Sequence, residues 1–222
     1  MDTGIRYRLC IFDLDGTLTD TIGGIAYFAN SALNRFGYGS IETEAYKVLV
    51  GDGARALIER ALRSVGAPVA DAGAVLKFYN KIYNENFLYK TTVYDGIPEL
   101  LAQLKQNGVK TAVLSNKPHE TTVKVLEALF PRGAFDIYFG AREGVPLKPD
   151  KTAVLEIIGK LGARHGECLY VGDTATDVQT GKGAGLFTAG ALWGFRTRAE
   201  LEQAGADVIA EKPSDILALI PL

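Results

Sequence analysis

Apolar residues along the chain gather in short continuous runs, which are separated by longer segments where they recur at helical spacing. Continuous runs predict β-strands that are covered on both faces. Five of them lie at residues 8–12, 109–114, 136–139, 167–171 and 186–189. The later runs alternate with predicted helices at residues 97–108, 118–130 and 151–162. This alternation predicts an α/β fold, with a Rossmann-like parallel sheet and helices on both of its faces.

The connection between the first two predicted strands breaks this alternation, because it is far longer than an ordinary loop. Helical patterns within it occupy residues 21–36, 53–66 and, in an aromatic-rich stretch, 69–90. We therefore predict an inserted α-helical domain at residues 19–90. The α/β core domain would then comprise residues 1–18 and 91–222.

The composition is that of an ordinary globular protein, with 47% hydrophobic and 23% charged residues among 222. A formal net charge of −2 provides no basic field for nucleic acid or an anionic membrane. No apolar run reaches the roughly 18 residues that a membrane span requires. The apolar run near the N-terminus is short and has charged residues on both sides. This pattern is not that of a signal peptide. We predict a cytoplasmic protein that binds neither nucleic acid nor membranes.

The cysteine and histidine content narrows the chemistry that the chain can perform. Cys10 and Cys168 both fall within strand-like apolar runs, which predicts buried reduced thiols rather than a disulfide framework. With two histidines in the whole chain, a His-rich transition-metal site is not expected. Chemistry would therefore rest on carboxylates, hydroxyl groups and lysines.

Chemically capable residues follow several of the predicted strands, most of them directly, with Lys148 in the loop after the third strand and Asp177 one helical turn beyond Asp173. Because ligands bind beyond the carboxyl ends of the strands in an open parallel sheet, these residues are expected to converge. In chain order they are Asp13, Asp15, Ser115, Asn116, Lys148, Asp173 and Asp177.

Several carboxylates in one crevice require compensation. Two of them about 4 Å apart repel by roughly 4 kcal/mol at an effective dielectric constant near 20, so either protons or a cation must join them. An all-oxygen ligand set without histidine or cysteine suits Mg²⁺, and Lys148 adds a fixed positive charge. Such a site could receive a phosphate group. One aspartate could then attack phosphorus, and a second could transfer protons.

Four short motifs resemble, in order, those of the haloacid dehalogenase-like hydrolase superfamily. They are DLDGT at 13–17, SN at 115–116, KP at 148–149 and GDTATD at 172–177. A helical insertion directly after the first motif resembles the cap of the first subfamily. Within the superfamily, segments 51–62 and 115–129 resemble those of the phosphoglycolate phosphatases.

The resemblance implies a role for each motif residue. Asp13 would be the nucleophile and a Mg²⁺ ligand, and Asp15 the general acid and base, with its backbone carbonyl on the same ion. Asp173 would be the remaining carboxylate on the metal. Asp177 would orient Lys148 or metal-bound water.

Further residues of the motifs would bind the substrate. The resemblance implies that Ser115, Asn116 and Lys148 hold the transferring phosphoryl group. Thr17, which is typical of the phosphatases in the superfamily, joins the substrate-binding set.

Simpler structural roles compete with several of these assignments. Ser115 could be a helix N-cap, Lys148 an ordinary surface lysine, and Asp177 a first-turn residue stabilised by the helix dipole. Trp193 is expected to serve packing more than ligand contact, although its loop follows the fifth predicted strand.

Arg55 is the candidate for recognising the part of the substrate that is not phosphate. It lies near the start of a predicted helix in the insertion, and arginine pairs with carboxylates through two parallel hydrogen bonds. The competing interpretation is an ion pair on the protein surface with Glu59.

These observations together predict a Mg²⁺-dependent phosphomonoester hydrolase that works through an aspartyl-phosphate. Its partner would be a small phosphorylated metabolite, with 2-phosphoglycolate favoured, and the chain would be a monomer or a homodimer. The alternatives are a pyrophosphatase or a nucleotide or sugar phosphatase with the same core. A phosphosugar mutase and a non-enzymatic receiver-like module are less favoured, and so is a dehalogenase, which has no need of a second acid such as Asp15.

Overall fold

A six-stranded parallel sheet forms the centre of the computed structural model, which describes residues 7–220. The strand order is β5-β4-β1-β6-β7-β8. The bounds are β1 Leu9–Phe12, β4 Lys110–Pro118, β5 Ile137–Ala141, β6 Cys168–Gly172, β7 Phe187–Ala191 and β8 Val208–Ala210. The α/β fold and the five predicted strands are confirmed.

The sixth strand, β8, was not predicted from the sequence. It has three residues, lies at the edge of the sheet and pairs with β7 alone. An edge strand of this length carries too few apolar residues to form a recognisable run.

Strand β1 lies at the centre of the sheet, where it pairs with β4 on one side and β6 on the other. Phe12 is in register with Val113 of β4 and Val171 of β6. The backbone N–H of Asp13 then donates a hydrogen bond to the carbonyl of Val171, at 2.9 Å. The first motif therefore leaves the sheet at its middle, between the ends of two neighbouring strands.

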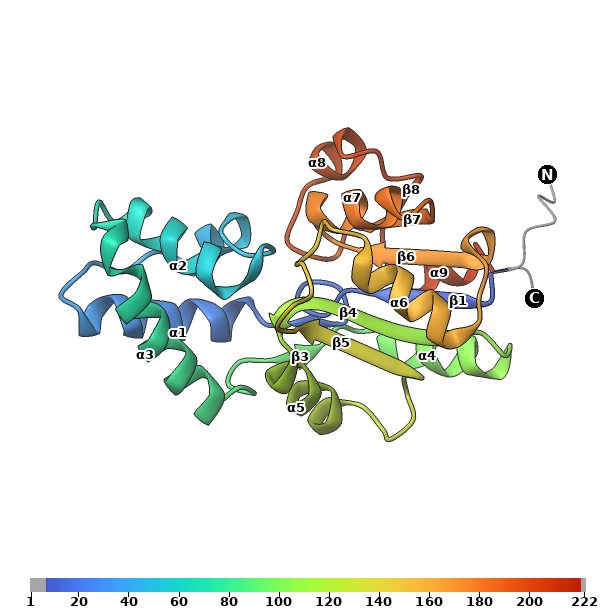
Figure 1. Ribbon diagram of the computed structural model, residues 1–222, viewed down its shortest axis with the longest axis horizontal. Coiled ribbons are helices and arrows are strands. Elements are labelled where there is room, and N and C mark those ends of the chain that lie inside the picture. The colour runs from blue at the N-terminus through green and yellow to red at the C-terminus, as the bar shows by residue number, and fades with distance from the viewer. Residues whose placement is uncertain (1–6, 221–222) are drawn as a thin grey trace.

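Helices cover both faces of the sheet, as predicted (Figure 1). Their bounds are α4 Ile97–Gln106, α5 His119–Leu129, α6 Thr152–Leu161, α7 Ala175–Gly183, α8 Arg198–Gln203 and α9 Ser214–Leu217. Side chains of β1 alternate between the two faces. Cys10 and Phe12 join the apolar cluster that contains α4, α5 and α9. Leu9 and Ile11 join the cluster that contains α6.

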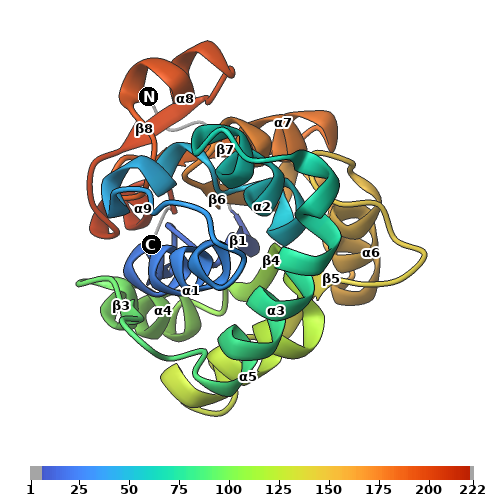
Figure 2. The same ribbon diagram turned by 90° about the vertical axis from the view of Figure 1, so that its left-hand side faces the viewer.

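The long connection after β1 is helical. It contains α1 Ile22–Arg35, α2 Gly53–Ser64 and α3 Ala72–Glu85, with the short 3₁₀ helices η1 Thr43–Val48 and η2 Val69–Asp71. Their buried apolar residues form a cluster of their own, to which the core contributes Phe195. In Figure 1 these helices lie beyond one end of the sheet, and in Figure 2 they lie in front of it.

Two short strands join this helical segment to the sheet. β2 Thr19–Asp20 and β3 Thr92–Val93 pair in antiparallel fashion, so the chain enters and leaves the helical segment side by side. The stretch 69–90 is mostly helical, as predicted, with η2 and α3 reaching Glu85 and turns at residues 87–90.

Other predictions concern the cysteines and the ends of the chain. Cys10 and Cys168 are both buried and free, as predicted. In the described part of the chain, no helix has the length and apolar character that crossing a membrane would take. The ends of the predicted core domain, residues 1–6 and 221–222, lie outside the described residues, as does part of the charged N-terminus.

Candidate active site

Three aspartates converge at the carboxyl ends of two neighbouring strands. Asp13 follows β1, Asp173 follows β6, and Asp177 lies in the first turn of α7. All three side chains are buried, and each offers an oxygen that lies within 4.8 Å of the others. The convergence predicted from the strand order is therefore present.

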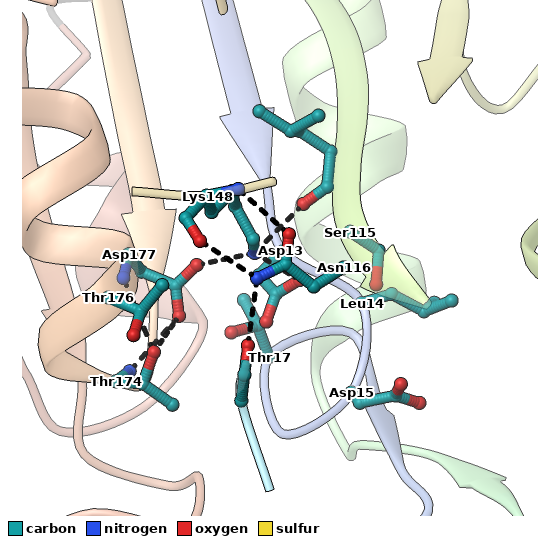
Figure 3. A network of polar contacts seen from close by, with 12 residues as sticks. Asp13, Leu14, Asp15, Thr17, Ser115, Asn116, Lys148, Thr174, Thr176 and Asp177 are labelled. Atoms are coloured by element: carbon teal, nitrogen blue, oxygen red, sulfur yellow. Dashed lines mark hydrogen bonds and ion pairs between the residues drawn. The ribbon is translucent and has the colours of Figure 1, made fainter. Parts of the chain in front are cut away.

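Lys148 joins this cluster from the loop after β5. Its Nζ lies 2.8 Å from Oδ1 of Asp13 and donates hydrogen bonds to Oδ1 of Asp177, at 2.7 Å, and to the carbonyl of Leu114, at 3.1 Å. Figure 3 shows the lysine between the two carboxylates. Burial alone would lower the pKa of Lys148, but Asp13 and Asp177 raise it well above its ordinary value. Lys148 is a buried cation and not a surface lysine.

Asp177 is fixed by the start of its own helix. Its Oδ2 accepts hydrogen bonds from the backbone N–H of Thr174, at 3.1 Å, and from the Thr174 hydroxyl, at 2.6 Å. Its Oδ1 accepts a bond from the hydroxyl of Tyr170, at 3.3 Å. Both interpretations of this residue agree with the geometry, since one carboxylate caps the helix and also orients Lys148.

Asp173 is held by the loop that follows β7. The backbone N–H of Phe195 donates to its Oδ2 at 2.9 Å, and the hydroxyl of Thr17 donates to its Oδ1 at 3.1 Å. The indole of Trp193 in turn donates to the carbonyl of Thr17, at 2.9 Å. Thr17 is completely buried and does not line the pocket, so the structure places it as support for the Asp173 carboxylate.

Burial and mutual repulsion shift the pKa values of these acids. Burial raises the pKa of Asp13 to about 7, the Asp177 carboxylate adds to the rise, and Lys148 opposes it. The pKa of Asp173 lies well above its ordinary value, again through burial first and then through Asp177 and Asp13. One lysine does not balance three buried acids. A cluster of carboxylate oxygens with unbalanced charge fits a hard divalent cation.

Ser115 and Asn116 lie at the end of β4, as predicted. Ser115 is buried and lines the pocket, and its hydroxyl accepts a hydrogen bond from the backbone N–H of Lys117 at 3.2 Å. Because α5 begins only at His119, Ser115 is not a helix N-cap. The side-chain amide of Asn116 donates to the carbonyl of Lys148 at 3.2 Å and accepts from its N–H at 2.9 Å. Asn116 therefore fixes the backbone that carries the buried lysine.

Asp15 stands apart from the three aspartates, and its carboxylate faces another lysine. Figure 3 shows its side chain to one side of the cluster. Lys117 donates to both of its carboxylate oxygens, at 2.9 and 3.0 Å. The sequence predictions did not include Lys117, although it directly follows the SN motif and is therefore carried to the same edge of the sheet.

Comparison with known proteins identifies the family. The sequence model of one protein family, the haloacid dehalogenase-like hydrolases, matches residues 10–191 of this chain. This span includes every motif residue described above. The chain belongs to this family. It is a haloacid dehalogenase-like hydrolase, which confirms the resemblance seen in the four motifs.

Individual relatives cover nearly the whole hydrolase. The phosphoglycolate phosphatase of Aquifex aeolicus is 35% identical over 213 residues, which cover 96% of each chain. That of Pectobacterium atrosepticum is 31% identical and covers 94% of this chain and 90% of its own. A crystal structure from Lactobacillus delbrueckii subsp. bulgaricus, provisionally named phosphoglycolate phosphatase, aligns with a TM-score of 0.91 at 30% identity. This alignment covers 97% of the hydrolase and 99% of the other chain.

A pocket of the hydrolase lies between the aspartates and the helical segment. The core lines it with Asp13, Asp15 and Ser115, and the helical segment lines it with apolar and aromatic side chains such as Leu57 and Tyr83. Two of the phosphate-binding candidates, Ser115 and Asn116, therefore face the same space as Asp13 and Asp15, whereas Lys148 does not line the pocket.

Arg55 of the hydrolase does not line this pocket. Its side chain is 71% exposed, and its Nε lies 3.0 Å from Oε1 of Glu59. The helix that carries Arg55 turns its apolar face, with Leu57 and Ile58, toward the interior, and this arrangement leaves Arg55 on the solvent side. The structure thus shows the surface ion pair with Glu59, which was the alternative to a role of Arg55 in substrate recognition.

Polar contacts connect the helical segment of the hydrolase to the core around the pocket. Three of them are hydrogen bonds from core side chains to residues 50–52, at 2.7–3.0 Å. They are Thr176 Oγ1 to Asp52 Oδ1 at 2.7 Å, Arg196 Nη2 to the Val50 carbonyl at 2.8 Å and Asn116 Nδ2 to the Gly51 carbonyl at 3.0 Å. A further bond runs from Thr121 Oγ1 to Asn84 Oδ1, at 2.7 Å. The structure therefore represents a closed arrangement of the two parts.

Proposed function

We propose that this protein is a Mg²⁺-dependent phosphomonoester hydrolase whose favoured substrate is 2-phosphoglycolate. One observation carries the proposal: Asp13 lies 2.8 Å from Lys148 in a cluster of three acids, and it also lines a pocket together with Asp15, whose carboxylate stands apart from that cluster. The arrangement separates a candidate nucleophile from a candidate proton donor. The names of the Aquifex and Pectobacterium relatives support the choice of substrate.

The reaction would proceed in two transfers. An oxygen of Asp13 attacks phosphorus, the bond to the ester oxygen breaks, and Asp15 gives its proton to the leaving oxygen. Asp15 then takes a proton from a water molecule, whose oxygen attacks the aspartyl-phosphate and releases inorganic phosphate. Ser115, Asn116 and Lys148 hold the phosphoryl group during both transfers. Asp177 keeps Lys148 in place through the bond at 2.7 Å.

The acidic cluster is the proposed binding place of the metal ion. The side chains of Asp13 and Asp173 and the backbone carbonyl of Asp15 would be its ligands from the protein. When bound, Mg²⁺ would offset the charge of the carboxylates and of the phosphate, and it would polarise the phosphoryl group. The unbalanced negative charge of the cluster supports this assignment.

The helical segment would act as a cap domain over residues 19–90, and residues 1–18 and 91–222 would form the core domain. Closure of the cap would exclude bulk water from the aspartyl-phosphate and supply the wall that contacts the rest of the substrate. Support comes from the separate apolar cluster of the helical segment and from the paired strands β2 and β3 at its base.

Location and assembly remain predictions. The two free, buried cysteines are those expected in a reducing compartment and support a cytoplasmic protein. A small phosphorylated metabolite is the proposed partner, and the protein would act as a monomer or a homodimer.

Phosphate release from a panel of phosphorylated metabolites, with Mg²⁺ present, tests the proposal. We expect 2-phosphoglycolate to give the highest kcat/KM and chelation to abolish turnover. A preference for pyrophosphate, a nucleotide or a sugar phosphate would replace the proposed substrate. Substrate loss without free phosphate would instead indicate a mutase, and a single turnover would indicate a receiver-like module.

The variant Asp13→Asn separates chemistry from folding. We expect it to lose phosphoryl-enzyme formation by at least about a thousandfold, because the amide oxygen is a poor nucleophile. Trapping of radiolabelled phosphate on acid-quenched protein measures this loss, and the circular dichroism spectrum should stay unchanged. Phosphoryl-enzyme at the wild-type level would contradict the assignment of the nucleophile.

A further inference from the structure

The pocket contains a cation that the phosphoryl-transfer chemistry does not use. Lys117 is anchored at the end of β4, and its side chain is only 7% exposed. Two of its N–H groups point to the carboxylate of Asp15. The Tyr83 hydroxyl also interacts with this ammonium group, since burial alone would lower the pKa of Lys117 but Asp15 and Tyr83 together raise it. In the proposed function the phosphoryl group is held by Lys148, whose Nζ lies 2.8 Å from Asp13.

Charge in the pocket is distributed unevenly. Among the described residues that line it, Lys117 is the sole cation, and the residues that the helical segment contributes are all uncharged. Arg55, the other residue considered for binding a substrate anion, is directed to solvent. A negative group on the substrate, apart from its phosphate, could therefore find an opposite charge in this lining only at Lys117.

Tyr83 of α3 completes the surroundings of this lysine. Nζ of Lys117 lies 4.8 Å from the centre of the Tyr83 ring, a cation–π distance. The Tyr83 hydroxyl is buried, lines the same pocket and has no hydrogen-bond partner in the described structure. A buried hydroxyl without a partner is costly, so a ligand that accepts a hydrogen bond there would remove the penalty.

We propose that Lys117 and the Tyr83 hydroxyl bind a carboxylate of the substrate and so select carboxylated phosphate esters over uncharged ones. The inference rests on the proposed function in one respect. There Asp15 gives a proton to the ester oxygen, so this oxygen must lie close to Asp15. In 2-phosphoglycolate the carboxylate carbon is two bonds from that oxygen. Lys117 contacts Asp15 at 2.9 Å, so a carboxylate at this place lies within its reach.

The site is completed by two different parts of the chain. Lys117 belongs to the sheet, and Tyr83 belongs to the helical segment that covers it. The ring covers the ammonium group and excludes water from it, which strengthens the attraction for a carboxylate. Recognition of the substrate is thereby linked to the closed arrangement of cap and core.

Binding of two phosphonates that cannot be hydrolysed tests this inference directly. One is 3-phosphonopropionate, which keeps the carboxylate, and the other is propylphosphonate, in which a methyl group replaces it. Calorimetry with the Mg²⁺-loaded wild type should show a preference of about 10- to 100-fold for the carboxylated ligand. Lys117→Met and Lys117→Gln should bring this ratio close to one, and Tyr83→Phe should reduce it about fivefold.

Lys124→Met is the matched control, because Lys124 lies on the exposed side of α5 and does not line the pocket. It should keep the wild-type preference. Kinetics add a second readout: Lys117→Met should lower kcat/KM for 2-phosphoglycolate by the same factor as the affinity ratio and affect ethyl phosphate much less. Melting temperatures of all variants show that they are folded.

Two results would overturn the inference. The wild type could bind both phosphonates equally, or the Lys117 variants could lose affinity for both by the same factor, which would mean that the lysine acts only on Asp15. The failure of the proposed function looks different. If 2-phosphoglycolate is not hydrolysed but Lys117 still gives a preference for the carboxylated phosphonate, the anion-binding site is supported and the proposed substrate is wrong.

Discussion

The buried carboxyl groups that the proposed chemistry uses also lower the stability of the folded protein when they ionise. Burial raises the pKa of Asp13 to about 7, whereas its ordinary value is 3.8. Between these two pH values the folded protein holds a proton that the unfolded chain has released. The free energy of unfolding contributed by this group therefore falls as the pH rises from about 4 to 7. Asp173, whose pKa is also raised, acts in the same direction.

Asp173→Asn tests this electrostatic cost. Without metal, we expect the variant to melt at a higher temperature than the wild type, with a difference that grows from pH 5 to pH 8, because repulsion grows as the acids ionise. Mg²⁺ should raise the melting temperature of the wild type more at pH 8 than at pH 5 and leave the variant almost unchanged.

Thermal unfolding with chelator or with Mg²⁺ measures both effects. Glu99→Gln, at an exposed carboxylate of α4, is the control and should respond to Mg²⁺ as the wild type does. A Mg²⁺ response that is independent of pH, or one retained in Asp173→Asn, would contradict a metal site at these acids.

At the scale of elements, the loop after β7 decides where Asp173 points. Gly194 passes so close to this aspartate that a Cβ at position 194 would lie 2.3 Å from the Asp173 Cβ. Phe195, the next residue, supplies the N–H that holds the carboxylate. The loop therefore needs glycine for a close approach of backbone to side chain.

Gly194→Ala should displace Asp173 and lower Mg²⁺ affinity at least about tenfold, with a loss of about 1–3 kcal/mol in stability from overpacking. Gly159→Ala is the matched control, since a Cβ at that exposed position of α6 meets no atom within 4 Å. It should raise stability by about 0.5–1 kcal/mol, because alanine favours the helix. Calorimetric titration with Mg²⁺ and urea unfolding measure both variants. Unchanged Mg²⁺ affinity in Gly194→Ala would show that the loop does not position Asp173.

Over the whole molecule, the pocket exists because the helical segment is docked on the sheet. Asp52 is central to this docking. It accepts a hydrogen bond from Thr176 of the core at 2.7 Å and is ion-paired with Arg60 of its own helix. Burial opposes ionisation of Asp52, but these bonds outweigh it, and the pKa lies below its ordinary value. Asp52 therefore stays charged and keeps the contact at neutral pH.

Asp52→Ala should weaken the closed arrangement and reduce kcat/KM about tenfold, while the core keeps its stability. Hydrogen exchange at residues 50–53 should become faster, because these backbone groups lose their fixed neighbours. Glu44→Ala, at an exposed ion pair within the helical segment, is the control and should change neither quantity. Exchange rates equal to those of the wild type would exclude Asp52 from the docking.

The sequence by itself determined the parallel sheet, the helical insertion and the residues at the strand ends. These depend on local periodicity and on the rule that the ends of parallel strands meet at one edge. It therefore predicted that Asp13, Lys148, Asp173 and Asp177 would meet. Short β8 escaped prediction because edge strands need little apolar sequence.

Only the tertiary structure decided what each polar side chain faces. Thr17 supports Asp173 from behind, Arg55 turns to solvent, and Lys117 is buried against Asp15. These orientations depend on contacts between residues far apart in the chain, such as Lys117 of β4 with Tyr83 of α3. The physical reason is that hydrogen bonds and charges are local in space, whereas hydrophobic periodicity records only which face of an element is buried.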